Sequence, residues 1–386
     1  MNRRDTMKAL LAGEQPELTP QWLMAFSGTG LAHRLMPAEC LDDAYAEYPA
    51  EGAYPFSGLR EGRLARRVAF NTHIDRCAFP VGWGANAAFG HAGPGEFNKR
   101  VIEQSAERLV VEYETGAKRE IRRNPHNYHT FYLPIQNADD LARFELPDPE
   151  APARYQGFAE DVAWAKAHGE WTVGWVNGFY SGVHYFLRPY EEFCVDLLGD
   201  PEFARALIER VGNWSLAAAR KMCEAGVDGI GFCDDLGSGQ SLLMSPALYR
   251  EFILPWHRRL CELVHAYGAV VHMHSHGAIL PILGDIASAG VDILNPLDPD
   301  DHMPLAEARV AVGPKVVLCG GMNKHFFDWS ETEQVAHLRA VIATGRKLGP
   351  HILMDSGGIP DSVERPWFDW FLATSRELRG EGRVSC

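Results

Sequence analysis

The sequence predicts an α/β fold, a closed (β/α)8 TIM barrel with an N-terminal elaboration. First, from residue 155 onward, short apolar runs of strand length alternate with longer helical stretches. Second, these runs are mostly apolar, which is typical of parallel strands that are buried on both faces. Third, no GxGxxG or Walker A loop follows a first strand, so an open doubly wound sheet is disfavoured.

The N-terminal part, residues 1–150, is expected to form strands, a hairpin and a cap around the barrel. A short helix over 4–11 and a strand over 21–26 open the chain. Alternation over 108–122, interrupted at Gly116, predicts a β-hairpin. Because six β/α units are visible later in the sequence, we expect this part to supply the two missing barrel strands.

The regular β/α units are expected over residues 151–380, in a single domain that spans 1–386. Helices are predicted over 155–168, 189–198 and 201–225. Strands are predicted over 172–176, 229–233, 270–274, 293–296, 316–319 and 352–355. The last five of these strands each follow a helical stretch that ends in glycine, the residue that most readily terminates a helix.

The composition excludes several classes of protein. The chain has 386 residues, 46% of them hydrophobic, and a formal net charge of -14, so it can bury a large core but offers no basic surface to nucleic acid. No apolar stretch reaches the ~18 residues of a membrane span, and we expect a cytoplasmic protein that binds no membrane. The 8 cysteines include no CxxC pair, which argues against a zinc ribbon or a disulfide framework.

Three aspartates stand at or just past the ends of predicted strands, where TIM-barrel enzymes keep their reactive groups. Asp234 and Asp235 are adjacent, so their carboxylates point to different sides, and one can face the pocket while the other caps the next segment. The facing carboxylate could bind a metal or a substrate amine, or act as a general acid. Asp355 ends the last predicted strand, at the point where the chain turns. All three are candidate catalytic residues.

The segment from His272 to His276 carries the sharpest signal. The strand period of two places His272, His274 and His276 on one face, which at the barrel mouth is the pocket. Three histidines on one face are costly to bury without partners, so metal binding, proton transfer or substrate binding is favoured over packing. We assign His274 and His276 as candidate catalytic residues and, with Asp355, as candidate metal ligands.

A further group of residues is expected to bind the substrate. The loop after the strand 172–176 is aromatic and polar and suits a pocket wall, although ordinary loop packing explains it equally well. The candidate substrate-binding residues are Trp83, Asn177, Tyr180, Tyr185, Gln240, His272 and Asn295. Cys319, at the end of its strand, is interpreted as a buried inert thiol rather than a metal ligand.

Several motifs in order resemble the uroporphyrinogen decarboxylase superfamily over residues 155–375. They are Asp234-Asp235-Leu-Gly-Ser, Ser245-Pro-Ala-Leu-Tyr249-Arg-Glu-Phe252, His274-Ser-His276-Gly and Gly290-Val-Asp-Ile-Leu-Asn295-Pro. The resemblance implies a TIM barrel and one of two activities. Decarboxylases of the superfamily work without a cofactor, whereas its corrinoid-dependent methyltransferases often use zinc. The resemblance also implies a homodimer.

The chain departs from both branches at the residues that bind ligands. In place of the Arg-Gln-Ala-Gly-Arg segment that binds tetrapyrrole carboxylates in the decarboxylases, it has Trp22-Leu-Met-Ala-Phe-Ser-Gly. The methyltransferases usually hold zinc with a His-x-Cys pair, which maps to His274 and His276, and with a later Cys, which maps to Gly357. A site of His274, His276 and Asp355, extended by Asp235, would still suit zinc with an open position.

These features predict a methyltransferase that moves a methyl group from a small methylated substrate to a thiol or to a corrinoid on a partner protein. Zinc, or a protonated Asp or His, would polarise the methyl-bearing atom, and Trp83, Tyr180 and Tyr185 would wall the substrate off from water. The alternative is decarboxylation of uroporphyrinogen or a related small acid without a cofactor. A third alternative is a binding protein that has lost the chemistry.

Overall fold

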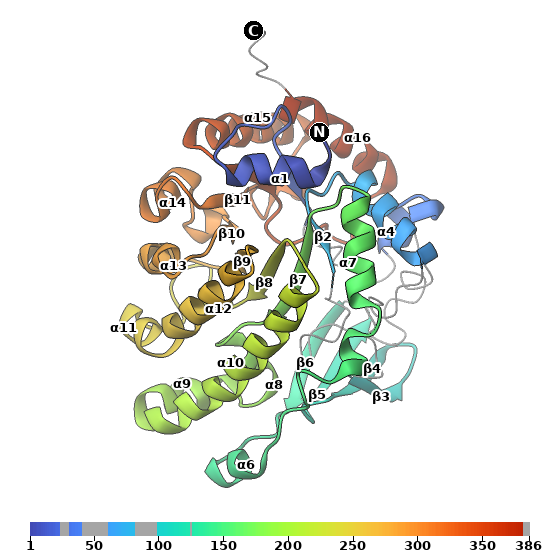
Figure 1. Ribbon diagram of the computed structural model, residues 1–386. Coiled ribbons are helices and arrows are strands. Elements are labelled where there is room, and N and C mark those ends of the chain that lie inside the picture. The colour runs from blue at the N-terminus through green and yellow to red at the C-terminus, as the bar shows by residue number, and fades with distance from the viewer. Residues whose placement is uncertain (24–30, 41–60, 82–98, 124–125, 381–386) are drawn as a thin grey trace.

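The parallel sheet of the protein curls into a barrel (Figure 1). The computed structural model describes residues 1–23, 31–40, 61–81, 99–123 and 126–380. Within them, one 8-stranded sheet has the order β1-β12-β11-β10-β9-β8-β7-β2. The strands are β1 (Gln21–Trp22), β2 (Phe79–Pro80), β7 (Thr172–Asn177), β8 (Gly229–Cys233), β9 (Val270–His274), β10 (Ile293–Asn295), β11 (Val317–Gly321) and β12 (His351–Met354).

The two edge strands of this sheet meet. Gln21 of β1 pairs in parallel with Arg76, just before β2, and the Cys77 amide donates to the Gln21 carbonyl at 2.7 Å. The hydrogen-bonded ring is therefore continuous, and the predicted TIM barrel is confirmed. The two strands expected from the N-terminal part are β1 and β2.

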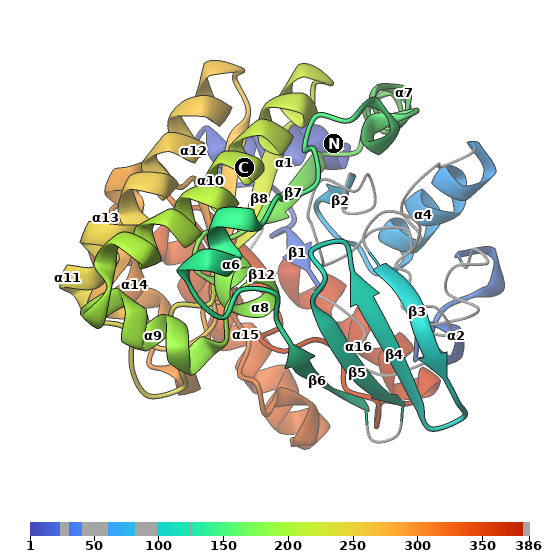
Figure 2. The ribbon, with the colours of Figure 1, turned by 90° about the horizontal axis from the view of Figure 1, so that it is seen from below.

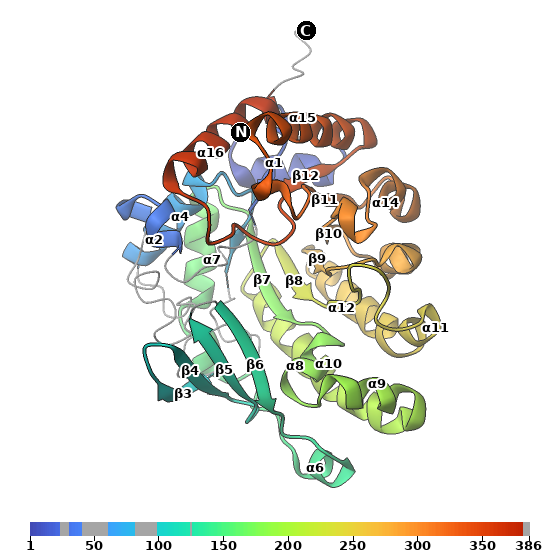
Figure 3. The ribbon, with the colours of Figure 1, turned by 180° about the vertical axis from the view of Figure 1, so that it is seen from behind.

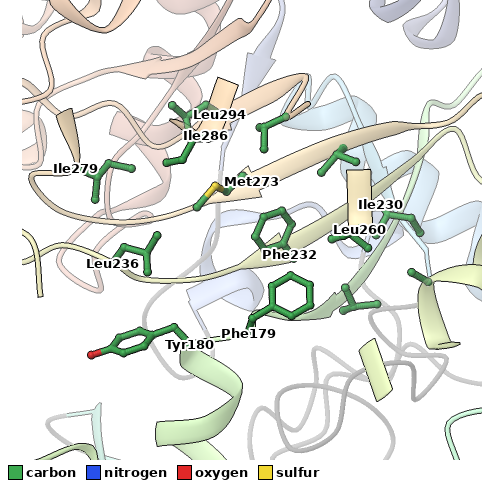
Figure 4. Close-up of a cluster of buried hydrophobic side chains, with 14 of the residues drawn as sticks. Phe179, Tyr180, Ile230, Phe232, Leu236, Leu260, Met273, Ile279, Ile286 and Leu294 are labelled. Carbon is green, nitrogen blue, oxygen red and sulfur yellow. The ribbon is translucent and has the colours of Figure 1, made fainter. Parts of the chain in front are cut away.

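Side chains of alternate strand residues fill the barrel interior. Trp22, Trp175 and Ile293 belong to one buried cluster there. Trp175 needs a glycine opposite, because a Cβ atom at Gly231 would lie 2.7 Å from its ring. The opposite face of the strands packs under the helices, as Figure 4 shows for Phe232 and Met273. The strands are thus buried on both sides, which explains why most of their residues are apolar.

Helices cover the outside of the barrel (Figures 1 and 2). They are α7 (Phe158–Ala167), α8 (Ser181–Phe186), α9 (Tyr190–Gly199), α10 (Pro201–Glu224), α11 (Pro246–Leu248), α12 (Leu254–Ala266), α13 (Leu283–Ala289), α14 (Leu305–Val312), α15 (Glu331–Leu348) and α16 (Arg365–Gly380). Side chains cap the long ones, since Asp200 accepts the Phe203 amide at the start of α10 and Ser330 forms a capping box with Glu333 on α15. No described helix is both long enough and apolar enough to cross a membrane.

The remaining described elements decorate the barrel. They are α1 (Arg3–Leu11), α2 (Leu31–Leu35), α4 (Glu61–His73), α6 (Ala138–Arg143) and a 4-stranded antiparallel sheet of β3 (Lys99–Gln104), β4 (Arg108–Tyr113), β5 (Lys118–Arg123) and β6 (His126–Tyr132). The predicted hairpin is confirmed as β4 and β5, which turn at Gly116 with φ +84°. This sheet lies beside α8 (Figure 3), where the Tyr113 and Phe186 rings contact at 5.5 Å.

Candidate active site

Asp234 and Asp235 at the end of β8 point to different sides, as the sequence predicts. The Asp234 carboxylate is fully buried and accepts the backbone amides of Phe179, Tyr180 and Ser181 at 3.1, 2.7 and 2.8 Å. Its Oδ2 also lies 2.9 Å from His257 Nε2. With four partners already in place, Asp234 fixes the start of α8 and has little capacity left for a substrate.

Residue 178, which lies against the end of β8, has no room for a side chain. A Cβ atom at Gly178 would lie 1.9 Å from the Cys233 carbonyl oxygen and 2.6 Å from Asp234 Oδ1. From the outer side, the Tyr249 hydroxyl lies 3.0 Å from Nδ1 of His257 and holds that ring against Asp234. The β7 and β8 loops are thereby held together, and the start of α8 is fixed beside the end of β8.

Asp235 faces the pocket side. Its Oδ1 accepts the His276 amide at 3.0 Å, its Oδ2 accepts the Tyr185 hydroxyl at 3.3 Å, and Oδ1 lies 3.7 Å from His274 Nε2. The side chain keeps 24% of its surface exposed. Asp235 is therefore oriented by two donors yet reachable, which is the arrangement expected of a reactive or metal-binding carboxylate.

Cys233, Asp235 and His274 form a group whose ligand atoms lie within 4.8 Å of one another. Among the residues that the structure describes, this is the group that meets the geometric requirement for holding a metal ion. Ligand atoms around one tetrahedral zinc ion lie about 3.5 Å apart, so the group is slightly more open than a filled site. Burial raises the pKa of the Cys233 thiol well above its usual value, so the metal-free site keeps this thiol protonated at neutral pH.

One ring nitrogen of His274 is hydrogen-bonded to Asn295, and the other faces Asp235. Its Nδ1 lies 2.7 Å from Asn295 Oδ1, and because that oxygen only accepts, Nδ1 carries the proton. Its Nε2 is then the lone-pair nitrogen. Burial, partly opposed by Asp235, lowers the pKa of His274 to about 4, so the ring is neutral at neutral pH and can act as a ligand or base.

His276 and Asp355 were assigned with His274 as metal ligands, and the structure places them differently. Strand β9 ends at His274, so the strand period does not set the side of His276; its amide bond to Asp235 does, and its ring lies 4.7 Å from that of His274. Asp355 is fully buried, and its Oδ2 accepts the Gly358 amide at 2.7 Å. Asp355 is not part of the group around Asp235.

The expected substrate-binding residues fall into separate environments. Tyr185 contacts Asp235 at the barrel mouth, and Asn177 ends β7 in a buried position. Gln240 is exposed on the rim, 3.4 Å from His302. Tyr180 is fully buried with its hydroxyl 3.6 Å from Cys194 Sγ on α9, and it belongs to the core cluster of Figure 4.

The other residues of this set lie deeper in the barrel or outside the residues that the structure describes. His272 is buried in the barrel interior, with its ring against Trp22 at 4.8 Å, and Asn295 is buried beside it. Trp83 lies outside the described residues. Cys319 is a buried thiol against Met354 Sδ at 3.3 Å, as the sequence predicts.

Two site residues escaped the sequence reasoning. Cys233 follows Gly229 and Gly231 in the alternate series of β8, so its inward direction could have been read from the strand period. His184 lies between the rings of Tyr180 and Tyr185 at 4.8 and 4.3 Å, and burial lowers its pKa to about 4. Among the described residues its Nε2 has no hydrogen-bond partner. No sequence pattern marks this position, because its helix α8 has only 6 residues and is too short to show a periodic pattern.

Comparison with known proteins adds a family and a fold. The family described as uroporphyrinogen decarboxylase (URO-D) matches residues 111–377. A relative named uroporphyrinogen decarboxylase from Streptomyces coelicolor is 26% identical over 242 residues, which cover 60% of this chain and 66% of that protein. One of the same name from Saccharopolyspora erythraea is 26% identical over 254 residues, covering 60% and 65%. The chain thus spans just under two thirds of the length of these relatives.

A solved structure resembles the whole chain. A methyltransferase from Methanosarcina mazei superposes with a TM-score of 0.63 over 98% of this chain and 99% of its own, at 16% identity. At this identity the likeness shows the fold alone. The fold and the family motifs therefore agree, and the reaction has to be argued from the site.

Proposed function

Since the chain belongs to the uroporphyrinogen decarboxylase (URO-D) family, we propose that it is an enzyme of the methyl-transferring branch of that superfamily. It would move a methyl group from a small methylated substrate to a thiol or to a corrinoid acceptor. The observation that carries this proposal is the group of Cys233, Asp235 and His274, whose ligand atoms lie within 4.8 Å of one another. A thiolate, a carboxylate and an imidazole are the ligands that zinc takes in proteins.

The residues of the group fit zinc in chemistry as well as in distance. His274 offers a lone pair at Nε2, Asp235 is oriented by Tyr185 and by the His276 amide, and Cys233 would lose its proton on binding. Three protein ligands leave one position open, which is typical of catalytic rather than structural zinc. When bound there, zinc would supply Lewis acidity at the methyl-bearing oxygen, nitrogen or sulfur.

The other side chains at the mouth would handle the proton and the substrate. The Tyr185 hydroxyl, which Asp235 holds in place, can pass its proton to the departing group of the substrate. His276, with its ring beside His274, is a second proton donor within the site. Asp234 holds the loop that carries Tyr185 and takes no part in the reaction itself.

Charge argues against a tetrapyrrole substrate. A porphyrinogen with several carboxylates needs cationic partners, yet the segment after β1 from residue 23 to 31 contains no Arg or Lys, and the net charge is -14. The ionisable side chains gathered around His274 are a carboxylate, a thiol and an imidazole. A small neutral or cationic methylated compound suits them better. A corrinoid-carrying partner protein and a homodimer belong to the same proposal.

Decarboxylation is the second candidate, because the curated relatives carry the name uroporphyrinogen decarboxylase. In that reaction the site would work without metal, with Asp235 and Tyr185 placing a proton on the carbon that loses carbon dioxide. The two proposals thus assign the same residues to different reactions and differ in their need for Cys233.

A direct assay separates methyl transfer from decarboxylation. Purified protein loaded with zinc is mixed with reduced cobalamin and, one at a time, methanol, methyl ethers of phenols, methylamines and methyl thioethers, and methylation of cobalamin is followed by absorbance. We expect turnover with one of these classes, and a loss of ~10²-fold or more in Cys233→Ser and Asp235→Asn. Cys319→Ser, which replaces a buried strand thiol outside the group, is the matched control.

The outcome decides between the candidates. A protein that consumes uroporphyrinogen with release of carbon dioxide, and does so equally well as Cys233→Ser, would establish decarboxylation and remove methyl transfer. Methylation of cobalamin that depends on Cys233 but not on Cys319 would establish the reverse.

A further inference from the structure

A side-chain bridge runs from the barrel interior to the site. The Asn295 amide lies between two imidazoles: its Oδ1 is 2.7 Å from His274 Nδ1, and its Nδ2 contacts His272 Nε2. His272 and Asn295 are each 1% exposed. The sheet register creates this arrangement, since Asn295 pairs with His274 across β9 and β10 and Ile293 pairs with His272. Asn295 therefore reaches its partner strand both directly and diagonally.

With the Asn295 amide oriented in this way, the hydrogen-bonding rules allow one proton arrangement in this bridge. An amide oxygen only accepts and an amide nitrogen only donates, so His274 must carry its proton on Nδ1 and His272 must offer a lone pair on Nε2. A neutral imidazole has one protonated nitrogen and one with a lone pair, so the state of the second nitrogen in each ring follows. His274 keeps its lone pair on Nε2, which lies 3.7 Å from Asp235 Oδ1, and His272 carries its proton on Nδ1.

That last proton has no conventional acceptor. Among the described residues, Nδ1 of His272 is buried without a hydrogen-bond partner, and the ring stands edge-on to Trp22 at 84°. A buried donor without an acceptor lowers stability. The neighbouring interior positions are filled by Ile293, Val317 and Ile352, which pack without such a cost. Packing alone therefore gives no reason for a histidine at position 272.

We infer that His272 and Asn295 are positioning residues that hold His274 in the tautomer whose Nε2 lone pair faces Asp235 and Cys233. They do not contact the reacting atoms. Their effect is to make His274 ready to bind a metal ion or take a proton without first moving its own proton between nitrogens. The inference rests on the proposed function for what His274 does, but the tautomer itself is a property of the metal-free protein.

The test reads the tautomer directly. Metal-free protein labelled with ¹⁵N-histidine is studied by long-range ¹H–¹⁵N NMR, in which protonated and lone-pair ring nitrogens have separate shifts, and His274→Gln identifies the signal. In the native protein we expect Nδ1 protonated and Nε2 as the lone-pair nitrogen. Asn295→Leu, which removes both bonds, and His272→Leu, which frees the amide to turn, should shift His274 towards a mixture of tautomers.

Two further variants keep the test informative if the leucine variants fold poorly. Asn295→Asp should keep the native His274 signal, because a carboxylate accepts from Nδ1 of His274 and from a re-tautomerised His272. His351→Gln replaces another buried histidine that has no part in the bridge, and it should leave the signal unchanged. Titration with zinc alone should show ~10- to 100-fold weaker binding in Asn295→Leu than in Asn295→Asp.

A native tautomer in both folded leucine variants, or equal zinc binding in the two Asn295 variants, would overturn the inference. If only the proposed function fails, the leucine variants will still shift the His274 tautomer, but the native protein will not methylate cobalamin.

Discussion

At the scale of single residues, Asp234 and Asp235 differ in what surrounds them. Asp234 is fully buried with four partners, so Asp234→Asn places amide protons against donors, and we expect the free energy of unfolding to fall by about 3 kcal/mol. Asp235→Asn should cost far less stability while lowering activity. Urea unfolding monitors both, with exposed Asp361→Asn as the control, which loses only the surface pair with Arg34, worth about 0–1 kcal/mol. Equal destabilisation by the two site variants would contradict this division.

His351 links stability to pH. Burial lowers its pKa to about 4 in the folded protein, against an ordinary value of 6.5. As the pH falls below 6.5, the unfolded chain binds a proton that the folded ring refuses until about pH 4, so this residue lowers stability by up to ~1.4 kcal/mol per pH unit in that window. His351→Gln should therefore lose less stability than the native protein between pH 6.5 and pH 4 when both are unfolded in urea. If the free energy of unfolding falls equally in both proteins as the pH is lowered, His351 is not the source of the loss.

The site could be predicted from sequence only in part. Asp235 and His274 stand directly at the ends of strands, where chain position and the strand period suffice to place them. Asp355 could not be separated from them, because its hydrogen bond to Gly358 is a property of a turn and not of spacing. The hydrogen-bond partner of His274 could not be predicted from the sequence either. Asn295 lies on a neighbouring strand, and only the register between β9 and β10 brings the two together.

At the scale of elements, the barrel strands depend on glycines where large rings occupy the interior. Gly231 of β8 faces Trp175 of β7, and a Cβ there would lie 2.7 Å from the ring. We expect Gly231→Ala to lower the free energy of unfolding by ~1–3 kcal/mol, since two hydrogen-bonded strands cannot move apart to make room. Gly199→Ala at the end of α9, where no atom lies within 4 Å of the new Cβ, should be neutral or stabilising. Thermal unfolding compares them, and an unchanged midpoint in Gly231→Ala would refute the steric argument.

Predictability of the elements follows their burial. Strands β7 to β12 are buried on both faces and were found from apolar runs, with ends shifted by a residue or two. The two-residue strands β1 and β2 carry too short a pattern to be located alone. Strands β3 and β6 were not predicted, because Lys99–Gln104 and His126–Tyr132 mix polar and apolar residues and pair at the edges of a small sheet. The central hairpin β4–β5 has the clearer alternation and the glycine turn, and it was found.

At the scale of the whole molecule, both ends of the described chain meet at the N-terminal end of the barrel, opposite the site. Residues of α1 and α16 line a common cavity of about 450 Å³ there. The Arg379 guanidinium, on a residue only 1% exposed, pairs with Asp75 at 2.6 Å and donates to the Thr19 carbonyl at 2.9 Å. One side chain thus ties the last helix to the approaches of β1 and β2, the two strands whose pairing closes the ring.

Replacing that side chain should weaken the barrel without touching its chemistry. Arg379→Met leaves Asp75 and the Thr19 carbonyl without their cation, and we expect a loss of about 3–5 kcal/mol in the free energy of unfolding. Arg143→Met, whose pair with Asp140 is 74% exposed on the arginine side, should cost under ~1 kcal/mol. In TIM barrels, stability resides at the N-terminal face and catalysis at the C-terminal face. Arg379→Met, measured at low temperature where it stays folded, should therefore keep the zinc binding that we propose for the native site. A variant that lost zinc while remaining folded would show that the two faces are coupled through β1 and β2, and the site would then depend on ring closure as well as on its own loops.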